Sequence, residues 1–276
     1  MKTLYITDLD GTLLNSDGHP SEFTVNTINS LIDKGLQFTV ATARSISSAA
    51  GLVECFNTKL PGVMMNGVFL TDLHTKEQHH VCKMHSDVAK QVIDAFVNAG
   101  RPPIVYTFDG HINAQFTEIK NDYEKNFIEK RKKLYHSFNQ VKVHDVGDDT
   151  VYINGIDYKE TMDKVAENLK NIKEIKFSYY LDVYSGDKYF IEVYSEDAGK
   201  QNTIERLKKL YGFDRVVAFG DNANDVEMLK AADLGVAVGN ARPEAIASAD
   251  VVIDTNDNDG VAKYLLSVFG KDANLV

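Results

Sequence analysis

The 276-residue sequence contains no tryptophan, only five prolines and only two cysteines, Cys55 and Cys82. The cysteines do not form a CxxC pair and are too few for a disulfide framework, so we expect thiols without a chemical role. No stretch approaches the roughly 18 apolar residues of a membrane helix, and the start of the chain lacks the features of a signal peptide. These absences argue against a disulfide-stabilised or membrane protein and predict a cytoplasmic location.

Positive charge is also scarce, since 30 Lys and Arg stand against 40 Asp and Glu, for a formal net charge of −10. Affinity for nucleic acid depends largely on clustered Lys and Arg, so nucleic acid is not an expected partner. With 43% hydrophobic and 25% charged residues, the chain can bury a core in one large domain or two modest ones. The composition does not specify an oligomeric state.

Short β-rich runs alternate with helical patterns in both end regions, which predicts βαβ units and a mainly parallel sheet. Between the first two runs, Ser21 marks a helix start and Gly35 a helix end, and QNTIERLKKLYG predicts a helix that ends at Gly212. The expected fold class is α/β, with a Rossmann-like, three-layer αβα core. The predicted strands are LYIT, LQFTVA and GVMM near the start, and YFIEVY, VVAFG, LGVAV and VVI from Tyr189 onwards.

The middle of the chain, residues 84–189, has a different character. It contains longer charged helical patterns such as SDVAKQVIDAFVNAG and isolated strand candidates such as PIVYTF, TVYING and KFSYYLDVYSG. We interpret it as an inserted α+β domain. The core would then be discontinuous and consist of residues 1–83 and 190–276.

Asp8 and Asp10 follow the first predicted strand, in the segment DLDGT. Ligands of open parallel sheets bind beyond the carboxyl ends of the strands, where this pair falls. Two carboxylates so close repel one another unless a cation or a shared proton intervenes, so the pair favours a hard metal ion such as Mg²⁺. By itself, the pair is equally well explained as a polar turn.

Three further segments place polar residues at equivalent positions. Thr42, in VATAR, follows the second strand, where its hydroxyl and nearby backbone N–H groups can hold a phosphoryl oxygen. Lys200 opens the helix after YFIEVY, and its ammonium could neutralise a nucleophile and a phosphoryl group. In GDNANDVEML, Asp221 could complete a metal shell, and Asp225 could hold a ligand or Lys200 in place. A helix cap or an exposed lysine would explain single features, but not the acidic cluster.

Taken in order, the four segments resemble the motifs of the haloacid dehalogenase-like (HAD) phosphatases. DLDGTLL is similar to the family's DxDGT[LV] nucleophile motif, ATAR to its Ser/Thr motif, Lys200 to its basic motif and GDNANDVEML to its GDxxND motif. The long insertion, the segment MNGVFL and the ending DGVAKYL resemble the Cof-type subgroup with a type II (subclass B) cap. There are two departures: Ala43 replaces the usual Gly of ATGR, and the basic motif reads GKQNTIERL instead of SKG or NKG followed by an apolar helix.

The resemblance implies Mg²⁺-dependent hydrolysis of small phosphorylated metabolites, such as sugar phosphates, through an aspartyl phosphate. Asp8 would attack phosphorus, and Asp10 would protonate the leaving alkoxide and then activate water. Thr42 and Lys200 would assist this chemistry. The implied metal ligands are Asp8, the backbone carbonyl of Asp10 and Asp221, and Asp225 would support these ligands without binding the metal. The implied substrate contacts are Leu9, Thr42, Ala43, Lys200 and Asn224.

The inserted cap would set substrate specificity, because a lid that closes over a site excludes water and selects the leaving group. Tyr106, Asp109 and His111, in VYTFDGHINAQF, are candidates for this role, although each is also plausible as an ordinary strand or turn residue. The sequence does not identify the metabolite.

Two alternatives stay open. A phosphomutase shares the aspartyl phosphate but returns the phosphoryl group to a sugar. A phospho-acceptor switch of the response-regulator kind also surrounds an Asp with acids, a Thr and a Lys. Such switches lack the long insertion and the second Asp two residues after the acceptor, so the order of motifs argues against them.

Overall fold

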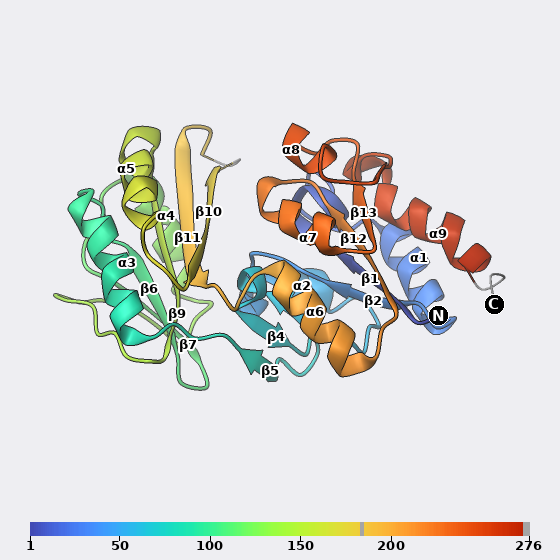
Figure 1. The fold of residues 1–276 in the computed structure, drawn as a ribbon, viewed down its shortest axis with the longest axis horizontal. Coiled ribbons are helices and arrows are strands. Elements are labelled where there is room, and N and C mark those ends of the chain that lie inside the picture. The colour runs from blue at the N-terminus through green and yellow to red at the C-terminus, as the bar shows by residue number, and fades with distance from the viewer. Residues whose placement is uncertain (183–184, 273–276) are drawn as a thin grey trace. The chain divides into compact units, whose positions relative to one another are not determined.

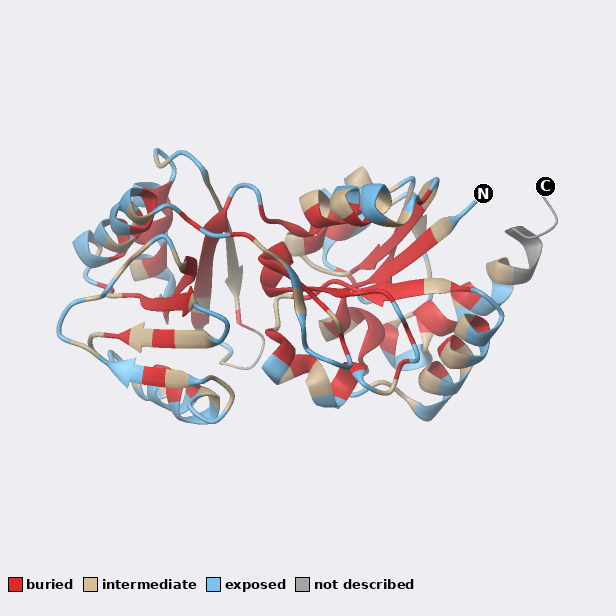
Figure 2. Cartoon of the chain, turned by 90° about the horizontal axis from the view of Figure 1, so that it is seen from below, coloured by how far each residue is buried: buried red, intermediate tan, exposed pale blue. Residues whose placement is uncertain are grey.

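The computed structural model describes residues 1–182 and 185–272, and the chain divides into two compact units (Figure 1). The first unit combines residues 1–80 with 199–276, and the second consists of residues 81–198. Buried residues run along the strands of each unit, as the red segments of Figure 2 show. In the described part of the chain, no helix has the length and apolar character needed to cross a membrane.

The first unit is built on a five-stranded parallel sheet with the order β14-β13-β12-β1-β2. Its strands are mostly buried on both faces, which explains why they appear in the sequence as nearly continuous apolar runs. They are β1 (Thr3–Thr7), β2 (Gln37–Val40), β12 (Arg215–Gly220), β13 (Leu234–Ala237) and β14 (Val251–Val252).

Helices cover both faces of this sheet (Figure 1). On one face, Ile6 of β1 packs in a cluster with Leu207 of α6 and Met228 of α7. On the other face, α1 and α9 lie against each other, and the ring of Phe219 meets that of Tyr264 in α9. The α/β fold class and the three-layer αβα core are therefore as predicted. The helices are α1 (Glu22–Asp33), α2 (Ile46–Val53), α6 (Lys200–Tyr211), α7 (Val226–Ala231), α8 (Pro243–Ile246) and α9 (Gly260–Asp272).

The helix ends follow local sequence signals. The hydroxyl of Ser21 caps α1 by accepting a hydrogen bond from the backbone N–H of Thr24 (3.0 Å). Helix α6 ends at Gly212, which has a φ of 64° in the left-handed region. Both ends lie where the sequence predicts them.

The third predicted strand, GVMM, does not extend the parallel sheet. Strand β3 (Gly62–Met64) pairs antiparallel with β4 (Phe69–Thr71), and both belong to a small sheet of order β3-β4-β5 that includes β5 (Gln78–Val81). A single parallel bridge between Ala41 and Val63 joins β3 to the end of β2. The turn at Met65–Gly67 reverses the chain between β3 and β4.

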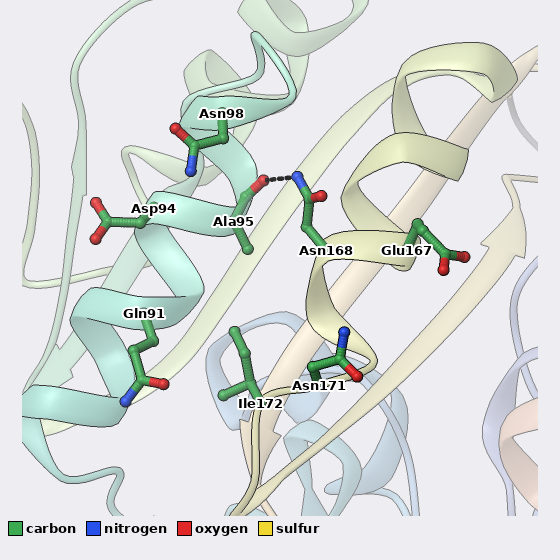
Figure 3. A pocket seen from close by; sticks show the side chains of 8 residues that line it. All are labelled: Gln91, Asp94, Ala95, Asn98, Glu167, Asn168, Asn171 and Ile172. Atoms are coloured by element: carbon green, nitrogen blue, oxygen red, sulfur yellow. Dashed lines mark hydrogen bonds between the residues drawn. The ribbon is translucent and has the colours of Figure 1, made fainter.

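The second unit is a six-stranded mixed sheet of order β10-β11-β9-β6-β7-β8. Helices α3 and α5 pack on one face, where Phe96 and Val165 join a cluster with Ile153 of β9. A polar groove runs along these two helices, and in it the Asn168 amide donates to the carbonyl of Ala95 (2.9 Å; Figure 3). The elements are α3 (Ser86–Asn98), β6 (Ile104–Phe108), β7 (Ile112–Phe116), α4 (Asp122–Arg131), β8 (Ser137–Gln140), β9 (Thr150–Tyr158), α5 (Lys159–Leu169), β10 (Ile175–Leu181) and β11 (Lys188–Ser195).

The placement of YFIEVY in the core sheet is wrong. This segment is the body of β11, which pairs antiparallel with β9 and β10 of the second unit. The boundaries between the two units lie at 80/81 and 198/199, where the sequence suggests 83/84 and 189/190. Because β11 is buried on nearly its whole length, its apolar and aromatic pattern resembles that of a core strand.

Candidate active site

Asp8 and Asp221 lie at the same end of the parallel sheet. Asp8 directly follows β1, Asp221 directly follows β12, and the two strands are parallel neighbours. The hydroxyl of Thr12 donates to Oδ1 of Asp221 (2.9 Å). Gly11 has a φ of 78°, and a Cβ built on it would lie 2.5 Å from Oδ2 of Asp221. Only glycine lets the loop pass so close to that carboxylate.

Lys200 connects this loop with the acidic segment after β12. It begins α6, is 4% exposed, and its Nζ lies 2.6 Å from Oδ1 of Asp8 and 2.6 Å from Oδ1 of Asp225. Burial alone would lower the pKa of Lys200, but the charges of Asp225 and Asp8 outweigh it and raise the pKa. The ammonium therefore stays charged at neutral pH.

Three carboxylates converge around this ammonium: Asp8, Asp221 and Asp225 each offer an oxygen within 4.8 Å of the others. Burial raises the pKa of Asp8 well above its usual value; Lys200 opposes the shift, and the neighbouring carboxylates add to it. Burial, followed by the charge of Asp225, raises the pKa of Asp221 to about 7. Negative charge in this cluster lacks sufficient compensation from the protein itself.

Asp225 has both of its oxygens engaged. Oδ1 accepts from Lys200, and Oδ2 accepts from the backbone N–H groups of Asp221 and Asn222, both at 3.1 Å. Its side chain is 0% exposed. These contacts make Asp225 a support for Lys200 and for the backbone of the Asp221 loop.

Asp10 is bound by Arg44, a residue that the sequence motifs do not identify as part of the site. The Nε of Arg44 donates to Oδ2 of Asp10 at 2.7 Å, and a terminal nitrogen donates to Oδ1 at 2.5 Å. Both side chains are partly exposed, at 27% and 43%. A signal was present, because Arg44 is the last residue of ATAR and a guanidinium fork suits carboxylates and phosphates.

Thr42 lies beside this pair in the chain and is 1% exposed. Its hydroxyl accepts a hydrogen bond from the backbone N–H of Arg44 (3.1 Å), so its own hydrogen can still be donated to a ligand. Leu9 is fully buried, so its side chain does not face a ligand. Ala43 and Asn224 are half-buried.

The cap candidates lie in the second unit. Tyr106 is buried at 2% exposure, with its ring edge-on to those of Tyr135 and Tyr152. Asp109 accepts from the backbone N–H of His111 (3.2 Å) in the exposed turn between β6 and β7. That contact gives Asp109 an ordinary turn-forming role.

The donor set of the first unit fits a hard divalent cation. Carboxylate oxygens are the ligands that Mg²⁺ and Ca²⁺ take in proteins. Among the described residues, ion pairs join Asp8, Asp10 and Asp225 of the four carboxylates to two cationic side chains, Lys200 and Arg44, so a divalent cation would balance the remaining charge. The pKa values of Asp8 and Asp221 are raised first by burial and then by the neighbouring carboxylates, and a bound cation would oppose both shifts.

The sequence model of haloacid dehalogenase-like hydrolases matches residues 5–265. The chain belongs to this family. The family expected from the four motifs is thus confirmed, and with it the prediction that the chain is an enzyme, a hydrolase.

Individual relatives span nearly the whole chain. The 5-amino-6-(5-phospho-D-ribitylamino)uracil phosphatase YitU of Bacillus subtilis is 28% identical over 282 residues, covering 95% of this chain and 96% of that protein. Among solved structures, a HAD-superfamily phosphatase from Bacteroides thetaiotaomicron aligns with a TM-score of 0.76 at 19% identity, over 98% of this chain and 96% of that one. A HAD subclass IIB sugar phosphatase aligns with a TM-score of 0.74 at 21% identity, over 98% and 99%. These structures share the fold of this family member.

Proposed function

We propose that this hydrolase removes phosphate from small phosphorylated metabolites, sugar phosphates or similar phosphomonoesters, through an aspartyl phosphate on Asp8. The observation that carries the proposal is the buried Lys200 ammonium, 2.6 Å from both Asp8 and Asp225 beside Asp221. A phosphomonoester is an anion that repels a carboxylate nucleophile, so a catalytic site needs fixed positive charge at this place. Lys200 supplies it without any rearrangement of charge during the reaction.

Asp8, the backbone carbonyl of Asp10 and Asp221 would hold a Mg²⁺ ion. When bound, the ion supplies positive charge that offsets the charge of the phosphoryl oxygens. Asp225 would act indirectly, because its oxygens already bind Lys200 and the backbone of Asp221.

In the proposed reaction, Asp8 Oδ attacks phosphorus while the bond to the leaving oxygen breaks, and Asp10 gives a proton to that oxygen. Water then attacks the aspartyl phosphate as Asp10 takes a proton back, which releases phosphate and restores Asp8. Arg44 fixes the plane of the Asp10 carboxylate by binding one lone pair of each oxygen. The other lone pair of each oxygen can hold the proton that Asp10 transfers. The phosphoryl group or the substrate would be contacted by Thr42, by Asn224 and by the backbone of Leu9 and Ala43.

The relatives support a hydroxyl-rich leaving group. Three Bacillus subtilis relatives, 26% to 28% identical, are 5-amino-6-(5-phospho-D-ribitylamino)uracil phosphatases, and one of the structural neighbours is a sugar phosphatase. Both kinds of substrate are phosphomonoesters of a hydroxylated carbon chain. We infer a substrate of the same class for this chain, with the second unit acting as the cap that selects it. A screen of such esters, ranked by kcat/KM, would identify it.

The covalent mechanism is tested with Asp8→Asn, which keeps the shape of the side chain but removes the nucleophilic charge. We expect no hydrolysis of a simple aryl phosphate and an unchanged circular dichroism spectrum, whereas Asp33→Asn, at the exposed end of α1, keeps full activity. EDTA should silence the wild-type enzyme and Mg²⁺ should restore it. Near-native turnover by Asp8→Asn would rule out the covalent role of Asp8.

The mutase alternative differs in its product. A sugar monophosphate supplied with a trace of the corresponding bisphosphate should release inorganic phosphate if the enzyme is a phosphatase. Isomerised sugar phosphate without free phosphate would identify a mutase instead.

A further inference from the structure

The turn at Met65–Gly67 belongs to the segment MNGVFL and has no role in the proposed chemistry. Its three residues all have positive φ, at 48°, 54° and 90°. Two successive residues with side chains in the left-handed region are uncommon, and such strain persists only where the surroundings enforce it. Met65 and Asn66 are buried, at 3% and 1% exposure. The contacts of this buried turn therefore enforce its conformation.

On one side, the turn is bonded to the segment after β2. The backbone N–H of Asn66 donates to the carbonyl of Thr42 (3.0 Å), and that of Met65 donates to the carbonyl of Arg44 (3.0 Å). These bonds fix the backbone of the segment that carries Thr42, Ala43 and Arg44. The turn therefore fixes the backbone positions from which the side chains of Thr42 and Arg44 extend.

On its other side, the turn is bonded to the start of α6. The backbone N–H of Gly199 donates to the carbonyl of Asn66 (2.9 Å), and the hydroxyl of Thr203 donates to the carbonyls of Gly67 (3.2 Å) and Gly199 (3.0 Å). A Cβ built on Gly67 would lie 2.4 Å from the carbonyl oxygen of Gly199. Gly199 is the residue before Lys200, so the turn touches the backbone from which the ammonium extends.

We propose that the Met65–Gly67 turn is a positioning element that sets the separation between Thr42 and Lys200 in the phosphoryl-binding site. The peptide groups of Asn66 bond in one direction to the Thr42 segment and in the other to Gly199, so one residue spans the two parts. Lys200 is hydrogen-bonded to Asp8 and Asp225 at 2.6 Å each, and a displacement of about 1 Å would break both contacts. This inference depends on the proposed phosphatase function.

Gly67→Ala tests the element, because the new methyl group must separate the turn from Gly199. We expect kcat to fall roughly 10- to 100-fold and the inhibition constant of inorganic phosphate to rise roughly tenfold, since supports of a catalytic group have effects of this size. The inhibition constant does not depend on the amount of folded enzyme, so a loss of stability alone leaves it unchanged. Gly212→Ala is the matched control, because Gly212 also has positive φ, at 64°, but its Cβ would meet nothing within 4 Å.

A double-variant cycle identifies the residue through which the turn acts. In a Lys200→Ala background, Gly67→Ala should add little further loss of phosphate affinity, because the group that it displaces is already gone. A full additional loss in that background would overturn the link between the turn and Lys200.

Thr203→Val keeps the test decisive if Gly67→Ala does not fold. This change removes the hydroxyl that ties α6 to the turn and preserves the side-chain shape, so we expect phosphate inhibition to weaken about threefold. Thr58→Val, which removes another buried hydroxyl bonded to a backbone carbonyl, that of Phe38, should leave the inhibition constant unchanged. If the wild type is active and Thr203→Val binds phosphate as well as the wild type does, the positioning role is wrong. If the wild type does not release phosphate from any phosphomonoester, the proposed function itself is wrong.

Discussion

Arg44 binds both carboxylate oxygens of Asp10, with contacts of 2.7 Å and 2.5 Å. The pair joins the segment after β2 to the loop after β1, so the group proposed to move the proton is oriented by a neighbouring strand end. Bidentate contacts of this kind fix the direction of a carboxylate as well as its charge. Arg44 is therefore part of the candidate site, although none of the family motifs used above assigns it a role.

Arg44→Lys keeps the positive charge but cannot form the fork. We expect kcat/KM to fall about tenfold, because Asp10 loses its fixed orientation while the net charge of the site stays the same. Steady-state kinetics on a sugar phosphate measures the loss. Arg206→Lys, a substitution on the half-buried side of α6, serves as the control, and equal activity of the two variants would contradict the orienting role.

Mg²⁺ affinity should depend on pH through Asp221. Its pKa is about 7 in the folded protein against an ordinary value of 3.8, so the folded state holds this proton more tightly than the unfolded state. Without metal, the stability contributed by this group is fully present below pH 3.8 and is lost as pH rises through 7. Because Mg²⁺ needs the carboxylate, titration of Asp221 should raise its affinity by up to about tenfold per pH unit below 7, and Asp8, whose pKa is also raised, should add to the pH dependence.

Isothermal titration of Mg²⁺ at pH values on both sides of 7 measures this dependence, and thermal unfolding without metal measures the opposite trend in stability. Asp221→Asn should make both profiles less steep, since the amide does not titrate and only the contribution of Asp8 is left. Wild-type Mg²⁺ affinity that stays constant from acidic to alkaline pH would contradict the assignment of Asp221 to the metal.

The predictable parts of the fold and of the site are local in sequence. Asp8, Thr42 and Asp221 each follow a strand that is recognisable from a short apolar run, and parallel strands bring such ends to one edge of a sheet. The Arg44–Asp10 contact was missed because it depends on a side-chain conformation across 34 residues of chain. The unit to which strand β11 belongs is not predictable for a related reason, since strand pairing depends on distant partners and not on the strand itself.

Asn240 is a second residue that local patterns do not reveal. Its amide donates to the carbonyl of Gly11 (2.7 Å), and its Oδ1 accepts from the backbone N–H of Asn256 (3.0 Å). Gly11 in turn lies against the carboxylate of Asp221. Asn240→Ala should therefore lower kcat by roughly 5-fold, the effect of one ordinary hydrogen bond, and should also lower the thermal midpoint.

Asn29→Ala is the matched control for Asn240→Ala. Asn29 makes the same two kinds of bond, donating to the carbonyl of Cys55 and accepting from the backbone N–H of Asn57, both at 2.8 Å. Its loss should lower the thermal midpoint and leave kcat unchanged. If both asparagine variants change kcat equally, Asn240 has no special relation to the loop.

The buried pair of Arg101 and Glu124 tests the second unit separately from the chemistry. Both side chains are 0% exposed, and the Nε of Arg101 also donates to the carbonyl of Ile156 (2.9 Å). Glu124→Ala leaves the guanidinium buried without its hydrogen-bonded carboxylate partner, so we expect a loss of about 3 kcal/mol of stability and faster hydrogen exchange within residues 81–198. The double variant Arg101→Met/Glu124→Leu buries neither charge and so avoids the cost of desolvating them. We therefore expect it to be less destabilised than Glu124→Ala alone. Urea denaturation and hydrogen exchange measure these differences, and a double variant less stable than the single one would show that the ion pair itself stabilises the second unit.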